Sequence, residues 1–209
     1  MVPMVTAVTP KGERRRYALV SAAADLLCEG GFDAVRHRSV AKRAGLPLAS
    51  TTYYFSSLDE LIQKAVEHVG EREAQQMRRC VETLSHRRRG AESTADLLVD
   101  LLVGEGARVS EQLISRYERF IAGARQPGLR NVQRRMMTQR SAAVVEVVER
   151  SGRVVRAEML TALVCAVDGA VVAALVGDDE DGGGPRATAR ATLVDVIDVL
   201  APVRAEAHV

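Results

Sequence analysis

The chain has 209 residues, enough for one large or two modest domains, and 47% of them are apolar. Aromatic residues make up only 3% and Trp is absent, so the composition favours packed helices over sheets. The net charge of +2 hides an asymmetry: residues 1–90 carry 15 Lys and Arg against 10 Asp and Glu, and the remainder carries 14 against 17. A basic surplus at one end is what phosphate binding requires, although ordinary scatter of surface charge is an alternative.

Side chains that do chemistry are scattered along the chain. Cys28, Cys80 and Cys165 form no C-x-x-C pair, and their odd number argues against a disulfide framework. Buried apolar roles in a reducing cytoplasm are predicted for them instead. The four His are equally far apart, so we expect no metal site and no cofactor. The sequence has no nucleophile elbow, Gly-rich phosphate loop or paired His and carboxylate, which argues against an enzyme.

Two helices are predicted before residue 45. Residues 1–13 lack the cationic start and long apolar core of a signal peptide, and are predicted to be a disordered arm. The first helix is expected to open at Arg14–Arg16 and to end at Gly30-Gly31. The second helix follows Arg36 and carries small apolar side chains at helical spacing.

The stretch from Ser39 to Leu61, SVAKRAGLPLASTTYYFSSLDEL, predicts two short helices joined by a tight turn. Gly45 can take a positive φ at no steric cost, which ends the first of them. Pro47 suits the first turn of the next, because its missing N–H would be unpaired there anyway. This is the pattern of a helix-turn-helix, whose second helix lies in the major groove of DNA.

This order of residues resembles the N-terminal domain of the TetR (tetracycline-repressor-like) family of bacterial transcriptional regulators. No single segment is specific, but the ordered set with its spacing is; the alternative is an unrelated helical bundle with a chance Ala-Gly break. The resemblance runs from about residue 14 to residue 61 and depends on these segments: Gly31-Phe32-Asp33-Ala34, Arg38, Val40-Ala41, Ala44-Gly45-Leu46, Tyr53-Tyr54-Phe55 and Asp59-Glu60-Leu61.

The resemblance implies an all-α fold in two parts. An N-terminal three-helix helix-turn-helix head, residues 14–57, would bind DNA. A C-terminal helical domain, residues 58–209, would bind a small-molecule effector and form a dimer. A long connecting helix over residues 58–84 would join the two and carry the effect of the ligand to the head.

Candidate DNA contacts fall in and just before the helix-turn-helix. Arg38 is the first candidate for a base edge, because its planar donor fork matches guanine N7 and O6. Arg36 stands where the family usually has a capping Thr or Ser, so phosphate contact and weak capping are predicted there. If Leu46, Thr51 and Phe55 turn inward, the outer face offers methyl groups and hydroxyls but no cation. The full candidate set is Arg36, Arg38, Leu48, Ala49, Ser50, Thr52, Tyr53 and Tyr54.

Affinity is therefore expected to depend on cations around the second helix of the motif. The family often has a Lys phosphate clamp where Leu58 stands, and Ser56, Ser57 or the N-terminal arginines are candidates to replace it. The tyrosines could instead be packing residues. The cations concerned are Arg14–Arg16, Arg36, Arg38, Lys42 and Arg43.

Apolar periodicity predicts six helices after the motif, over residues 58–84, 91–103, 109–124, 129–150, 155–176 and 186–200. Ser56 or Ser57 is expected to cap the first of them. The inner face of the third is predicted to carry Leu113, Ile114, Tyr117, Phe120 and Ile121.

The last two predicted helices carry a second pattern. Residues 160–176 are almost wholly apolar, but they are short for a membrane span and have Asp168 at their centre, where a charge in a bilayer is costly. Ala recurs there every four residues, which allows close helix approach, and the resembling family dimerises through its final two helices. Burial inside a single chain is the alternative. The predicted dimer interface comprises Ala162, Ala166, Ala170, Ala174, Leu193 and Ile197.

An effector pocket is implied by the resemblance alone. Its candidate residues are Tyr117, Phe120, Met136 and Asp168, each of which could equally be ordinary core or surface. The predicted function is a cytoplasmic, dimeric, sequence-specific DNA-binding regulator, most simply a repressor released from a palindromic operator by an unidentified small molecule. The alternative is a helix-turn-helix protein without a small-molecule ligand, architectural or controlled by a protein partner. No membrane partner is expected.

Overall fold

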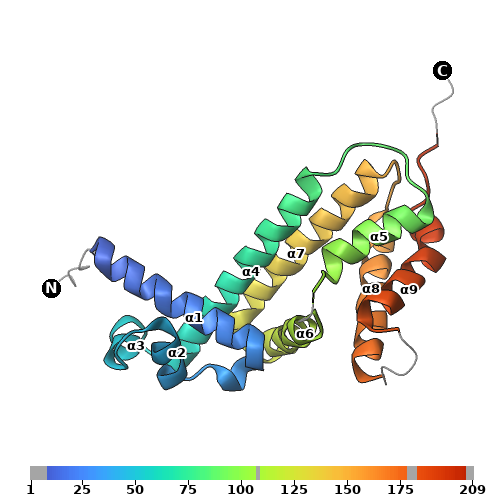
Figure 1. Ribbon diagram of the computed structural model, residues 1–209. Coiled ribbons are helices and arrows are strands. Elements are labelled where there is room, and N and C mark those ends of the chain that lie inside the picture. Colours follow the sequence, from blue (N-terminus) through green and yellow to red (C-terminus); the bar gives the residue numbers. More distant parts are fainter. Residues whose placement is uncertain (1–8, 107–108, 178–182, 206–209) are drawn as a thin grey trace. The chain divides into compact units, whose positions relative to one another are not determined.

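The computed structural model describes residues 9–106, 109–177 and 183–205 (Figure 1). Their regular structure is helical throughout, apart from one isolated bridge between Arg153 and Val203, so the all-α prediction is confirmed. The helices are α1 (Pro10–Ala34), α2 (His37–Ala44), α3 (Ala49–Tyr54), α4 (Leu58–Glu82), α5 (Ala91–Leu102), α6 (Val109–Arg125), α7 (Pro127–Arg150), α8 (Ala157–Val176) and α9 (Pro185–Leu200).

The helices form two compact units. The first contains residues up to 71 together with residues 115–132, and the second contains residues 72–114 together with the chain from 133 onward. The chain passes between them inside α4, α6 and α7. The first unit thus includes the start of α4 and the end of α6 in addition to the helix-turn-helix.

The first unit is built around α1, which begins earlier than predicted. Thr9 caps the helix by accepting a hydrogen bond from Gly12 N at 3.2 Å, and Pro10 occupies its first turn, so residues 10–13 are helical rather than part of a disordered arm. Residues 1–8 of that predicted arm lie outside the described residues. The predicted break at the glycines is present, because Gly31 has φ of 66° and ψ of −164°. Apolar residues without exposed surface form the core: Leu19, Ala23, Leu27, Val35, Val40, Leu61 and Ala65.

The exposed face of α6 differs from the prediction. Ile114 and Ile121 are 47% and 57% exposed, whereas Ser115 and Arg119 are buried. The reason is a polar tie to α1: Ser115 Oγ donates to the carbonyl oxygen of Leu27 at 3.0 Å, and Arg119 Nη1 donates to Ser115 Oγ at 2.8 Å. These hydrogen bonds determine which side of α6 faces inward. The spacing of apolar residues alone cannot predict them.

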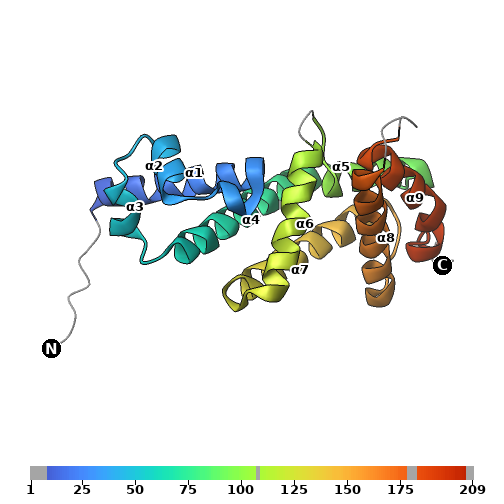
Figure 2. The same ribbon diagram turned by 90° about the horizontal axis from the view of Figure 1, so that it is seen from below.

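The second unit packs α9 against α8 on one side and α5 on the other (Figures 1 and 2). Leu98, Leu163, Val167, Leu193 and Ile197 have no exposed surface and form its core. Leu193 and Ile197 were predicted to face a second subunit; they are instead interior residues, because α9 turns this side toward its own chain. The burial predicted for the cysteines is wrong for Cys80 and Cys165, which are exposed free thiols.

Candidate nucleic-acid interface

The turn between α2 and α3 forms as the sequence predicts. Gly45 adopts φ of 64° and ψ of 30°, and its N–H donates to the last carbonyls of α2. The N–H of Leu46 donates to Ala41 O at 3.0 Å, which closes the helix end. The N–H of Ser50 then donates to Pro47 O at 2.9 Å, so Pro47 opens the turn that leads into α3. A residue with a side chain would be strained at Gly45.

Helix α3 has a clear inner and outer face. Thr51 and Phe55 are buried, with Phe55 only 2% exposed, and the Thr51 hydroxyl donates to Leu48 O at 2.8 Å. On the other side Leu48 is 53% and Tyr53 81% exposed, which is unusual for large apolar and aromatic side chains. Ala49 and Thr52 are also exposed, while Ser50 and Tyr54 are half-buried.

The two tyrosines at the end of α3 support one another. Their rings meet edge to face at 90°, with centroids 4.9 Å apart. Such a contact stabilises a pair by about 0.5–1.5 kcal/mol beyond burial and restricts the rotamer of the exposed ring. The Tyr53 hydroxyl is thereby held on the outer face of α3.

The cations around α2 are not equivalent. Arg43 makes two hydrogen bonds to Glu29 of α1, at 3.0 and 2.6 Å. These hydrogen bonds, and to a smaller extent the negative charge of Glu29, raise the pKa of Arg43. Arg36 pairs with exposed Asp33 at 2.9 Å. Arg38 and Lys42 are exposed and have no carboxylate partner in the part of the chain that the structure describes. Arg38 is therefore the more available guanidinium for a polar ligand.

The start of α2 has no side-chain cap. Arg36 occupies the N-cap position with extended φ and ψ of −129° and 147°, and its side chain makes no capping hydrogen bond. The weak capping predicted for this position is therefore present. The unpaired N–H groups of a helix start favour anions, which suits a phosphate oxygen at this place.

The junction between α3 and α4 is a network of hydroxyls and one carboxylate. Ser57 Oγ accepts from Glu60 N at 3.1 Å, which makes Ser57 the N-cap of α4. The carboxylate of Glu60 accepts from both the backbone N and the hydroxyl of Ser56, each at 2.7 Å. Arg16 of α1 lies over the ring of Phe55, with its guanidinium carbon 5.3 Å from the ring centroid. These contacts fix the end of α3 against α1 and α4.

The carboxylate of Glu60 provides a test of this junction by pH. The hydrogen bond from the Ser56 hydroxyl, followed by that from its backbone N–H, holds the pKa of Glu60 below its ordinary value. A carboxyl whose pKa falls on folding adds stability at neutral pH, and this stability is lost as the pH falls through the folded-state pKa. We therefore expect Glu60→Gln to lower the unfolding midpoint at pH 7, and expect the difference from the parent to shrink as the pH falls below the ordinary range of glutamate pKa values.

Thermal unfolding of both proteins across this pH range measures the effect. Glu71→Gln, which removes an exposed carboxylate further along α4, is the control for a general change of charge. A deficit that is the same at both ends of the pH range would contradict the assigned role of the Glu60 carboxylate.

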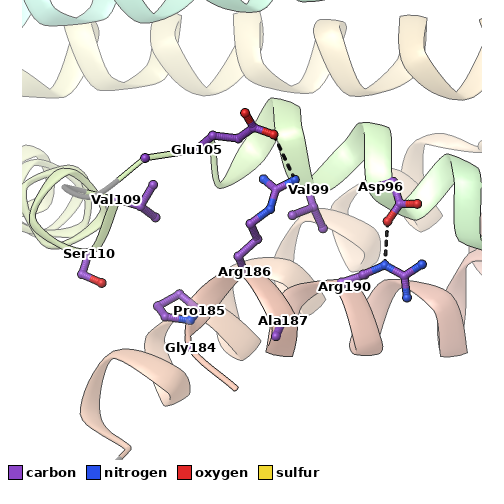
Figure 3. Close-up of a pocket in the computed structure, with 11 residues that line it drawn as sticks. Asp96, Val99, Glu105, Val109, Ser110, Gly184, Pro185, Arg186, Ala187 and Arg190 are labelled. Atoms are coloured by element: carbon purple, nitrogen blue, oxygen red, sulfur yellow. Dashed lines mark hydrogen bonds and ion pairs between the residues drawn. The ribbon is translucent and has the colours of Figure 1, made fainter. Parts of the chain in front are cut away.

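The predicted effector residues do not share one unit. Tyr117 and Phe120 belong to the first unit, where their half-buried rings meet edge to face with centroids 5.9 Å apart. Met136 and Asp168 belong to the second unit; Met136 is 8% exposed, and both oxygens of Asp168 accept hydrogen bonds from Arg140 at 2.7 and 2.8 Å. A cavity in the second unit, between α5 and the starts of α6 and α9 (Figure 3), is lined by none of the four. Their role as ligand contacts stays a prediction.

The burial of several polar residues could not be predicted from the sequence. Arg119 and Arg153 are each 1% exposed, and Gln133 is 5% exposed with neither amide atom hydrogen-bonded within the described chain. Arg153 Nη1 donates to Asp198 at 2.7 Å and to Ala201 O at 2.9 Å, across a separation of more than 40 residues. Only the partner's position in space identifies such residues.

Two protein-family models match the chain. One, described as "Bacterial regulatory proteins, tetR family", matches residues 19–65. The other, described as "Tetracyclin repressor-like, C-terminal domain", matches residues 89–199, which is more than half of the 209 residues. The search of the curated proteins gives no match.

Solved structures share the fold over nearly the whole chain. A protein from Streptomyces coelicolor A3(2), described as a transcriptional regulator, is 22% identical with a TM-score of 0.66, and the match covers 90% of this chain and 98% of that one. One from Saccharomonospora viridis, in complex with choline, is 17% identical with a TM-score of 0.71, covering 92% and 100%. The multidrug binding protein EbrR, complexed with proflavin, is 27% identical with a TM-score of 0.62, covering 88% and 99%.

Proposed function

Because the chain belongs to the TetR family of bacterial regulatory proteins, whose members are non-enzymatic DNA-binding transcription factors, we propose that it acts as a dimeric repressor. It would bind a palindromic operator in the cytoplasm and leave it when a small molecule binds. The observation that carries the proposal is the outer face of α3, where Leu48 and Tyr53 are exposed, together with the exposed Arg38 of α2, which has no carboxylate partner among the described residues.

Each side chain of this face suits a particular part of DNA. Arg38 would donate to guanine N7 and O6, and Leu48 and Ala49 would contact thymine methyl groups. Ser50 and Thr52 would donate to or accept from base edges. The remaining candidates, Arg36, Tyr53 and Tyr54, would meet phosphate oxygens, which fixes the register of the head without reading sequence.

The exposed surface of α8 supports a dimer. The helix is long and apolar enough, by length and composition, to cross a membrane. Only 17% of its most apolar 18-residue stretch is buried within the chain. Val172 is 45% and Val176 85% exposed, and Ala162 is exposed in the same helix. A soluble regulator must cover such a surface, and a second copy related by a two-fold axis does so for both chains. The two α3 helices would then read half-sites about 34 Å apart.

A small-molecule effector is supported by the ligands of related structures. The Saccharomonospora viridis protein was solved with choline and EbrR with proflavin, so this fold accommodates organic ligands in those proteins. Repression would end if the ligand favoured a conformation whose heads no longer match the operator spacing.

Selection of bound DNA from a random pool by the full-length protein tests this function. We expect enrichment of a palindrome, because two identical heads related by symmetry read the same half-site. Tyr53→Phe should weaken binding to all sequences, since only a phosphate hydrogen bond is lost, whereas Arg38→Ala should relax the preference at one base pair of each half-site by about 1–3 kcal/mol. No enriched sequence, or an unchanged preference in Arg38→Ala, would refute the assigned roles.

A further inference from the structure

The positive charge of the first unit comes mainly from α6 and α7, and only to a small extent from the helix-turn-helix. Residues 115–132 hold four Arg against one Glu, whereas the residues up to 71 hold nine Lys and Arg against eight Asp and Glu. Residues 1–8, which lie outside the described residues, contain no charged side chain, so these counts include every charged side chain of the unit. Three of the four surplus positive charges therefore follow the helix-turn-helix in the chain.

The exposed part of this charge lies at the corner where α6 turns into α7 (Figure 2). A single residue separates the two helices, since α6 ends at Arg125 and α7 begins at Pro127. Arg125 and Arg130 are exposed, whereas the other two arginines of the segment are buried or half-buried on α6. Arg130 Nη2 donates to the carbonyl oxygen of Ala124 at 3.2 Å, which brings its guanidinium to the end of α6, where Arg125 lies.

Both guanidinium groups of this corner keep donors for a ligand. A guanidinium has five N–H donors, and Arg130 uses one of them on Ala124. Neither Arg125 nor Arg130 has a carboxylate partner in the part of the chain that the structure describes, and no Asp or Glu occurs between Glu118 and Glu146. The end of α6 and the start of α7 contribute partial charges of opposite sign that offset one another. The corner therefore carries two available positive charges.

The corner lies against the first turns of α4. A Cβ atom placed on Gly128 would be 3.4 Å from Gln63 Oε1. Gln63 follows Ser57, the N-cap of α4, by six residues, so this contact is about 9 Å along the helix from the junction between α3 and α4. The two arginines thus belong to the same compact unit as α3 and lie close to its end.

The carboxylates of α4 near this contact are mostly offset by other cations. Glu67 pairs with Lys64 at 2.8 Å, and the charge of Arg16 acts on the carboxylate of Glu60. Asp59 is exposed and has no cation partner among the described residues. One carboxylate is therefore left against the two arginines of the corner.

We propose that this corner binds the phosphate backbone of the operator, with Arg125 and Arg130 as the contacting cations; the inference rests on the proposed DNA-binding function. Helix α3 carries no cation of its own, and Arg36 and Arg43 already pair with carboxylates. Duplex DNA carries one negative charge per about 1.7 Å of its axis, so a backbone held at the end of α3 also offers phosphates to cations about 9 Å away. A guanidinium matches phosphate oxygens with two parallel N–H donors.

Titration of the full-length protein with DNA over a range of salt concentrations tests the proposal, on the enriched palindrome and on a random-sequence duplex. Arg125→Gln combined with Arg130→Gln should lower the slope of log affinity against log salt by about 1.8 for each bound chain, which is about 0.9 for each lost phosphate contact. Arg87→Gln combined with Arg156→Gln removes two exposed arginines of the second unit and should keep the parent's slope. Arg125→Lys combined with Arg130→Lys keeps both charges and should also keep it.

An unchanged slope in the corner variant would overturn the assignment, and it is the result expected if the corner bound an acidic protein surface instead. An equal loss in the second-unit control, or in the lysine variant, would overturn it as well. The titration on random-sequence DNA needs no operator, so its result is separate from the selection experiment. An enriched palindrome with an unchanged slope would refute the corner and leave the regulator, whereas a reduced slope on random DNA without an enriched palindrome would do the reverse.

Discussion

Replacing Asp168 by Ala is expected to lower the free energy of unfolding by about 3 kcal/mol, because it leaves the guanidinium of Arg140 buried without its counter-charge. The Arg140 side chain is 9% exposed, and its two terminal nitrogens donate to the two oxygens of Asp168 at 2.8 and 2.7 Å. The pair joins α7 to α8 across 28 residues. Urea unfolding followed by far-ultraviolet circular dichroism measures the change.

Two further variants separate this ion pair from a general effect of charge. Asp195→Ala removes an exposed carboxylate of α9 and should change stability by less than about 0.5 kcal/mol. Arg140→Met combined with Asp168→Leu removes both charges and should recover much of the loss, because apolar pairs replace buried ion pairs well. Equal unfolding midpoints for Asp168→Ala and Asp195→Ala would mean that the pair does not stabilise the fold.

Replacing Phe55 by Ala should have an effect of similar size on the DNA-binding head. Truncating a buried Phe costs about 3–5 kcal/mol through lost burial and the cavity left behind. Phe55 is 2% exposed, ends α3, and carries the guanidinium of Arg16 over its ring. DNA binding should be lost together with stability, because α3 is no longer held against α1.

The adjacent tyrosine provides the matched control for this variant. Tyr53 is 81% exposed, so Tyr53→Ala should change stability little while still weakening DNA binding. Phe55→Leu should retain most of both properties because it fills most of the same volume. If Phe55→Ala unfolds at the parent's midpoint, the ring is not part of the core of the head.

Most of the helices could be predicted because neighbouring residues in the sequence determine where each helix begins and ends. The turn at Gly45, the cap at Ser57 and the inward positions of Thr51 and Phe55 follow from backbone preference and apolar spacing. Helix α1 begins before the predicted start at Arg14–Arg16. The Thr9 side chain caps a helix that starts at residue 10, and Pro10 suits its first turn.

Contacts between distant residues were not predictable in the same way. Arg43 and Glu29 are 14 residues apart, and Arg186 and Asp100 are 86 apart, so neither helical spacing nor composition relates them. The inner face of α6 differs from the prediction because Ser115 donates to a carbonyl of α1 and Arg119 donates to Ser115, so these polar residues lie inside in place of the isoleucines. The cavity between α5, α6 and α9 depends on three such placements at once.

The ion pairs beside α2 affect how DNA binding would respond to salt. A cation that settles on a phosphate releases a condensed counterion, and each such contact steepens the logarithmic salt dependence by about 0.9. Arg43 already shares its charge with Glu29, and Arg36 with Asp33, so either arginine reaches a phosphate only by leaving a carboxylate or by bringing it near the DNA. The number of phosphate contacts calculated from the salt dependence would therefore be smaller than the number of arginines that lie close to the DNA.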